Sequence, residues 1–166
     1  MTSATPGVTI RVQDFDFDVG AETAALSARC AVGDIGAISS FTGFVRQDGG
    51  LVALTLEHYP GMTERQLTTL ANDACQRWPL LGVTIIHRYG RLPVGSQIVL
   101  VLSASAHRAA AFEACAFLMD WLKTQAPFWK QEEWSSGETR WVEAKASDDH
   151  AAARWRDAPA GGDKGA

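Results

Sequence analysis

The sequence predicts an α+β fold with a largely antiparallel or mixed sheet. Segments of alternating apolar and polar residues are interleaved with segments of helical periodicity, in the order βαββαββαβα. Two pairs of strands follow one another with no helix between them, which favours antiparallel pairing. No strand is followed by a G-x-G-x-x-G turn, so a Rossmann fold is disfavoured. The 166 residues predict one domain over 1–157 and a polar, Gly-rich tail over 158–166.

The first half of the chain is expected to form a strand, a helix and a hairpin. Apolar and polar residues alternate over 8–13, which is typical of a half-buried strand. The Ala-rich segment 21–30 has helical spacing and is followed by a glycine that can close the helix. Residues 35–59 are predicted to form a hairpin, because the Gln-Asp-Gly-Gly turn at 47–50 supplies the positive φ that a tight reversal needs.

The second half is expected to alternate between helices and strands. Thr63 and Gln66 have capping-box spacing and predict the start of a helix that Pro79 ends. Beyond it the pattern predicts two neighbouring antiparallel strands, a long helix, a short strand and a last helix, at 82–92, 96–106, 106–124, 139–144 and 148–156.

Composition and charge exclude several classes of protein. A net charge of −4 and a pI near 5.5 have the wrong sign for binding a nucleic-acid backbone. No apolar run approaches the roughly 18 to 20 residues that cross a bilayer, and the start has no signal-peptide pattern, so a cytoplasmic protein with no membrane contact is expected. The three cysteines form no C-x-x-C pair and are expected to be buried, small apolar residues, while the four histidines have no metal-ligand spacing. No metal or cofactor is therefore expected.

The first candidate site lies at the start of the long helix, at His107 and Arg108. Cations at a helix N-terminus oppose the macrodipole unless an anion is bound there as well. The alternative is that both side chains reach solvent or a nearby carboxylate such as Glu113. The pair therefore predicts either an anion-binding site or an exposed surface.

Lys123, in the last turn of the same helix, is the second candidate. It continues a stripe formed by Phe112, Ala116 and Met119, so a partly desolvated amine is expected. Desolvation lowers the pKa of an amine and suits it to act as a general base or nucleophile. The alternative is a snorkelling lysine that the C-terminal end of the helix dipole favours.

Lys130 and Glu132 share one side of an extended segment beside Phe128 and Trp129. They could pair with each other or line an aromatic pocket, and an exposed edge strand with aromatic packing is the alternative. Arg46, after a strand end, is suited to bidentate recognition of an oxyanion. Together the cations indicate a small anionic, phosphorylated type of substrate.

Six motifs along the chain resemble a known family. They are F-T-G-F-V-R at 41–46, L-E-H-Y-P-G-M at 56–62, H-R-Y-G at 87–90, S-A-H-R at 105–108, M-D-W-L-K at 119–123 and A-P-F-W-K-Q-E at 126–132. In this order they resemble the large, catalytic subunit of molybdopterin synthase, over nearly the whole chain from about Val8 to Trp155.

The resemblance implies an α/β hammerhead-type fold and a homodimer at the centre of a heterotetramer. A ubiquitin-like small subunit binds at each outer end, and its C-terminal Gly-Gly carries a thiocarboxylate. Two sulfurs pass to cyclic pyranopterin monophosphate and form the dithiolene of molybdopterin. The sulfur therefore arrives on the partner, and no cofactor of the chain's own is implied.

The resemblance also implies roles for particular residues. Lys123 and Lys130 match the two essential lysines of the family. Residues that match its substrate-binding positions are Arg46, His107 and Arg108, with Phe44, Val45, Gln131 and Glu132 beside them. Phe44 and Gln131 stand where relatives often carry cations, and the 47–50 turn is shorter than usual. The alternatives are a phosphopterin- or nucleotide-binding module without turnover, and a module that only docks a ubiquitin-like protein.

Overall fold

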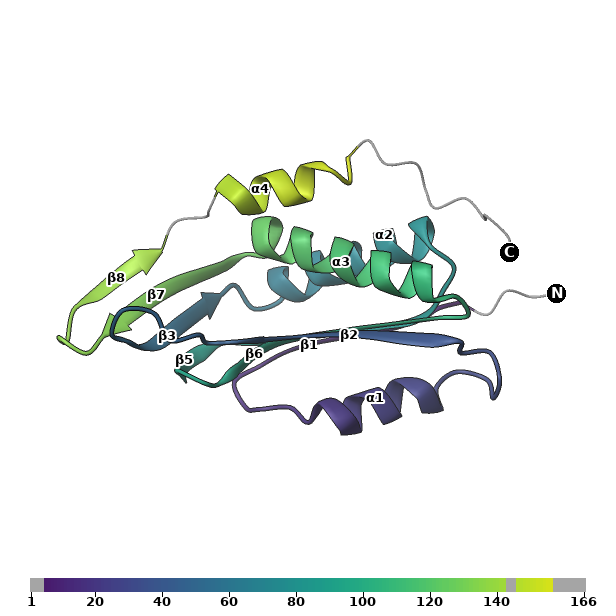
Figure 1. The fold of residues 1–166 in the computed structure, drawn as a ribbon, viewed down its shortest axis with the longest axis horizontal. Coiled ribbons are helices and arrows are strands. Elements are labelled where there is room, and N and C mark those ends of the chain that lie inside the picture. The colour runs from purple at the N-terminus through teal and green to yellow at the C-terminus, as the bar shows by residue number, and fades with distance from the viewer. Residues whose placement is uncertain (1–4, 143–145, 157–166) are drawn as a thin grey trace.

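The computed structural model describes residues 5–142 and 146–156, which form two four-stranded sheets and four helices (Figure 1). The elements in chain order are β1 (Gly7–Gln13), α1 (Val19–Ala28), β2 (Ala37–Phe44), β3 (Leu51–His58), α2 (Met62–Arg77), β4 (Leu80–Arg88), β5 (Gly90–Pro93), β6 (Gln97–Ser105), α3 (Arg108–Gln125), β7 (Phe128–Trp134), β8 (Thr139–Val142) and α4 (Ala146–Ala153). The predicted α+β class is confirmed. The predicted tail over 158–166 lies outside the described residues.

The larger sheet has the strand order β1-β4-β6-β2 and carries the main core. β1 runs parallel to β4, whereas β4 with β6 and β6 with β2 are antiparallel. Helices α2 and α3 cover one face, and α1 covers the other (Figure 1). The central strands β4 and β6 are nearly continuous apolar runs because both of their faces are buried. None of the described helices combines the length and apolar character needed to span a bilayer.

The smaller sheet has the order β5-β3-β7-β8 and is antiparallel throughout. It extends beyond one end of the larger sheet, and α3 leads directly into it (Figure 1). Its own core is small, consisting of Val45, Leu51, Leu56 and Leu92. β7 lies between β3 and β8, so the alternative of an edge strand for the segment 127–132 is wrong.

The predicted hairpin over 35–59 is also wrong, because β2 and β3 belong to different sheets. The backbone of Val45 still follows β6: its N–H donates to Ser96 O, and its carbonyl accepts from Gly95 N. The glycines of the 47–50 turn do have positive φ, as expected, but they redirect the chain into the smaller sheet. The pairing of β2 with β6 is therefore more stable than the hairpin with β3 that the turn sequence favours.

Helix α2 begins before the predicted capping box. The N–H of Gly61 donates to the Glu64 carboxylate at 2.6 Å, while the Thr63 hydroxyl donates to the Tyr59 carbonyl. Gly61 has φ of 82°, a conformation that glycine adopts at little cost, and this lets the helix start at Met62.

The cysteines are less uniformly buried than expected. Cys115 is buried, but Cys30 and Cys75 are only half-buried. Burial raises the pKa of the Cys75 and Cys115 thiols.

Candidate functional site

The direction of α3 separates the predicted site residues into two groups. The helix begins just after β6 and runs back along the larger sheet, over β6 and β2, toward the smaller sheet (Figure 1). Arg108 and Lys123 are 15 residues apart on this helix, which corresponds to about 22 Å at a rise of ~1.5 Å per residue. A single chain therefore does not bring these two cations together.

His107 and Arg108 lie at the N-terminal end of α3, as predicted. His107 is the N-cap with an extended backbone, and its N–H donates to the Ser105 hydroxyl at 3.2 Å. Both side chains are exposed, and no acidic residue occupies the first turn. The alternative partner, Glu113, instead accepts a hydrogen bond from the Trp78 indole at 2.8 Å. The arrangement leaves a helix terminus, the Arg108 guanidinium and the His107 imidazole exposed together.

Lys123 lies at the opposite end of α3 and is exposed, so the expected desolvation is wrong. The buried face of the helix is formed by other residues, among them Ala114, Leu118 and Leu122. The stripe that Lys123 continues is only partly covered, and the Phe112 side chain is 65% exposed. The amine is therefore open to a ligand or a partner chain.

Lys130 lies on β7, opposite Leu56 of β3 and Val142 of β8. Because side chains alternate along a strand, it shares a face with Phe128 and Glu132, as predicted. The Glu132 carboxylate accepts a hydrogen bond from Arg140 at 3.2 Å. Gln131 lies between them in sequence, on the other face of the sheet, and is half-buried.

Residues 44–46 lie at the end of β2 that is remote from His107. The register pairs Ala37 with Ser105 at one end of β2 and Phe44 with Gln97 at the other. Phe44 is 55% exposed and Arg46 is exposed, with only a 3.9 Å surface ion pair to Asp48. Val45 is 1% exposed and belongs to the core of the smaller sheet. The Val45 side chain is therefore covered in the single chain and packs beneath its exposed neighbours.

The sequence reasoning missed a cluster of rings where the two sheets meet. His87 of β4 stacks on Phe128 with ring centroids 3.8 Å apart, and His58 of β3 lies 5.9 Å from the same phenyl ring and 4.6 Å from Tyr89. The pKa of His87 is lowered to about 4, above all by burial; the hydrogen bond to the Arg88 carbonyl opposes this shift, and the charges of Lys130 and His58 contribute to it. Neither histidine by itself indicates that the rings meet, although His87 lies in the motif H-R-Y-G and His58 in the motif L-E-H-Y.

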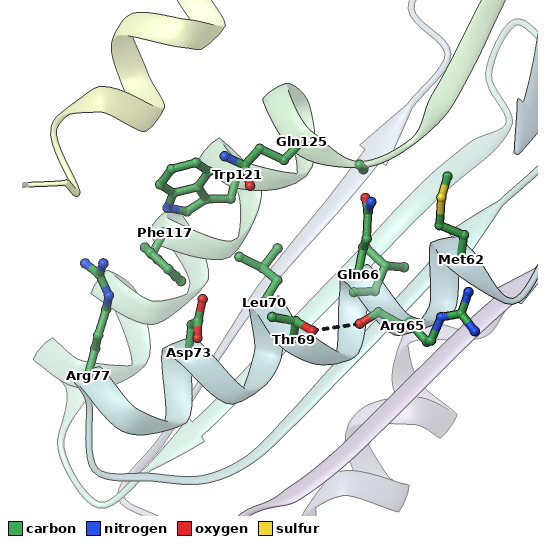
Figure 2. Close-up of a pocket in the computed structure, with 12 residues that line it drawn as sticks. Met62, Arg65, Gln66, Thr69, Leu70, Asp73, Arg77, Phe117, Trp121 and Gln125 are labelled. Carbon is green, nitrogen blue, oxygen red and sulfur yellow. Dashed lines mark hydrogen bonds between the residues drawn. The ribbon is translucent and has the colours of Figure 1, made fainter. Parts of the chain in front are cut away.

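Two hollows on the surface lie apart from most of these residues. A groove of about 620 Å³ runs between α2 and α3, with Leu70, Phe117 and Trp121 among its lining residues (Figure 2). Lys123 is two residues beyond Trp121, roughly 200° around the helix, and therefore on another flank. The second hollow, of about 330 Å³, is lined by Glu57, His58, Tyr59, Trp129 and Trp141. None of the predicted site residues lines either hollow.

Phe44 and His107 thus lie at opposite ends of the larger sheet, and Lys123 and Arg108 lie at opposite ends of α3. The fold and these exposed charged side chains define the class as an α+β protein with its candidate site residues on the surface.

Comparison with known proteins identifies the family. A family model described as MoaE protein matches residues 12–125. The molybdopterin synthase catalytic subunit of Mesorhizobium japonicum is 54% identical over 156 residues, which cover 93% of this chain and 97% of the relative. The solved MoaE protein from Burkholderia ambifaria has a TM-score of 0.77 and 51% identity, covering 89% of this chain and 97% of that one. This chain belongs to the MoaE family, the catalytic subunits of molybdopterin synthase.

A more distant structure has the same fold. It is a complex of subunits 1 and 2 of the molybdopterin-converting factor from Helicobacter pylori, with a TM-score of 0.65 and 19% identity over 84% of this chain and 90% of that one. The resemblance in the motifs, the fold class and the assignment to an enzyme of molybdenum cofactor biosynthesis are therefore confirmed.

Proposed function

We propose that residues 1–157 form one catalytic-subunit domain that transfers sulfur to cyclic pyranopterin monophosphate and so forms molybdopterin. The sulfur arrives as the C-terminal thiocarboxylate of a ubiquitin-like small subunit. Family membership supports this reaction. The short turn at 126–127, which joins the end of α3 directly to β7, supports a site that contains both Lys123 and Lys130. Lys123 carries the acid–base or transient covalent chemistry at the reacting carbon, and Lys130 contacts the incoming thiocarboxylate or the substrate.

The observation that carries the proposal is the separation of the two cationic groups along α3. A substrate phosphate bound at His107 and Arg108 is too far from Lys123 of the same protomer, at about 22 Å along the helix axis. A second protomer resolves this distance. Each site then takes its lysines from one protomer and its helix N-terminus from the other.

The edge of the larger sheet offers a surface for such a dimer. β2 is an edge strand with an unpaired side, and the α3 flank beside it exposes Phe112. Antiparallel pairing of β2 with its copy about a two-fold axis would place the Phe44 end of one strand beside the Ala37 end of the other. Arg46 and Lys123 would then face the partner's His107 and Arg108, with Phe44 at the same junction.

The small subunit completes the assembly, giving a heterotetramer with the homodimer at its centre. The Helicobacter pylori neighbour, a complex of two subunits, shares this fold and supports such a partnership. Lys130 and Glu132 lie on one face of β7, and Gln131 lies on the other, the face of Trp129 and its aromatic hollow. The partner's extended C-terminus approaches along the exposed Lys130 face of this strand.

The test is reconstitution from purified parts. The protein is mixed with a thiocarboxylated small subunit and cyclic pyranopterin monophosphate, and molybdopterin is assayed. Product is expected, and no product from a well-folded complex would overturn the proposal. A thermal-shift measurement with the phosphorylated pterin separates the alternatives: a binding module without turnover is stabilised by the ligand, and a pure docking module is not.

A further inference from the structure

The ring cluster at the meeting point of the two sheets connects Lys130 to the core of the larger sheet. His87 is 8% exposed and lies in β4, paired with Val12 of β1 and Val99 of β6. Its ring is nearly parallel to that of Phe128, at an interplanar angle of 17°. Phe128 begins β7, two residues before Lys130 and on the same face. The imidazole therefore supports the start of the strand that presents the lysine.

Hydrogen bonds fix which nitrogen of each histidine carries the proton. Nδ1 of His87 lies 2.9 Å from the Arg88 carbonyl, and because a carbonyl only accepts, this nitrogen carries the hydrogen. The neutral ring then has a free lone pair on Nε2. The Thr63 hydroxyl donates its hydrogen to Tyr59, so His58 Nδ1, at 3.2 Å, must donate to that hydroxyl. Both rings beside Phe128 therefore have Nε2 as an acceptor when neutral.

The groups that face His87 explain why its ring stays neutral. The neighbours on β1 and β6 are apolar, and the charged or titratable groups that act on it come from the smaller sheet: Lys130 on β7 and His58 on β3. Burial and these two groups lower the pKa of His87 to about 4, so the ring is uncharged near neutral pH. A second positive charge is thereby kept away from the Lys130 ammonium.

We propose that His87 is a positioning residue for Lys130, holding the start of β7 through its stack on Phe128 and providing a neutral, polar surrounding for the amine. This inference rests on the proposed role of Lys130 in sulfur transfer. The Phe128 ring positions the start of β7, and the His87 imidazole sets the polarity around the Lys130 amine. The two contributions can be separated by substitution.

The variants are His87→Phe, which keeps a ring for stacking, and His87→Gln, which keeps a polar group able to donate to the Arg88 carbonyl. Val99→Ala is the matched control, because Val99 faces His87 in the β4–β6 register and its truncation weakens the same core without removing the imidazole. Each is assayed as the reconstituted complex. We expect kcat to fall about tenfold or more in His87→Phe, less in His87→Gln, and little in Val99→Ala, with small-subunit affinity unchanged in all three.

A second measurement does not depend on turnover. The chain has four lysines, Lys123, Lys130, Lys145 and Lys164, so competitive labelling of amines as a function of pH, followed by mass spectrometry, reports on each. In His87→Phe the labelling midpoint of Lys130 should move to lower pH, because an apolar ring disfavours the ammonium, while Lys123 keeps its parent midpoint. If the Lys130 midpoint shifts in His87→Phe but the parent protein makes no product, the proposed function is contradicted and this inference still stands. An unchanged Lys130 midpoint in His87→Phe, or a kcat loss in Val99→Ala equal to that in His87→Phe, would overturn it.

Discussion

A site shared between protomers predicts that two impaired variants restore activity when combined in one dimer. Lys123→Ala removes the amine at one end of α3, and Arg108→Ala removes the guanidinium at the other, about 22 Å away along the same helix. Losing a hydrogen bond to a charged group costs about 1.5 to 3 kcal/mol, so the Arg108→Ala homodimer should bind the pterin roughly 10- to 150-fold more weakly. The Lys123→Ala homodimer should make almost no product.

In the hybrid dimer, one site contains both native residues and the other lacks both. Turnover per hybrid dimer should therefore be about half that of the parent, because a two-fold dimer has two equivalent sites. The assay uses co-expressed protomers with different affinity tags, purified in sequence, and measures molybdopterin at a pterin concentration below the dissociation constant of the Arg108→Ala dimer. The matched control is a hybrid of Lys123→Ala with Lys130→Ala, in which neither site has both lysines and activity should stay at background.

The opposite result has a clear meaning. If both ends of α3 served one protomer, the Lys123→Ala and Arg108→Ala hybrid would contain one site without the lysine and one without the arginine. Its activity would then stay at or below that of the Arg108→Ala homodimer. Recovery in the Lys123→Ala with Lys130→Ala hybrid would instead show that the two lysines come from different protomers.

Three further predictions concern stability and pH. Arg108→Ala should leave the unfolding midpoint of the free protein unchanged or slightly higher, because an exposed cation at a helix N-terminus is disfavoured by about 0.3 to 1 kcal/mol; a clear drop in urea unfolding would make Arg108 a structural residue. Lys123→Ala should change stability little because the side chain is exposed, whereas Leu118→Ala, at 0% exposure on the same helix, should cost about 2 to 5 kcal/mol by the same measurement. His87, with a pKa of about 4 when folded against 6.5 when unfolded, binds its proton more readily in the unfolded chain. The contribution of neutral His87 to the free energy of unfolding is therefore fully present above pH 6.5 and is lost as the pH drops toward 4, by roughly 3 kcal/mol in total. Urea unfolding of His87→Phe should show a flatter pH dependence over this range.

Elements with strong, continuous patterns were predictable from the sequence. β4 and β6 are apolar runs, and α3 is Ala-rich, so their local and tertiary preferences agree. The single strand predicted over 82–92 is nevertheless wrong at its end, because Gly90–Pro93 forms β5 in the other sheet. The hairpin over 35–59 failed because a glycine turn specifies only that the chain reverses. Which strand β2 pairs with was decided by the long-range contact with β6, about which the turn carries no information.

The sequence predicted which residues belong to the candidate site, but it did not predict their burial or their contacts. The motifs identified the lysines and the His-Arg pair, but the desolvation expected for Lys123 assumed that its stripe faced the core. The apolar face of α3 is wide, and Leu122 and Leu118 take the buried side. The partnership of His87 with Phe128 joins residues 41 positions apart, and only the meeting of the two sheets reveals it.

The exposure of the cations indicates that the active site is incomplete in the single chain. Lys123, Lys130, Arg46 and Arg108 are all exposed in the single chain, and exposed charges interact weakly through high-dielectric, screened solvent. Acid–base or covalent chemistry at an amine is most effective in a site from which water is excluded. A dimer across β2 would cover Lys123 and Arg46 with the second protomer, and the small subunit would cover Lys130. The low-dielectric site would thus form only on assembly, which would prevent the lysines from reacting before both partners are in place.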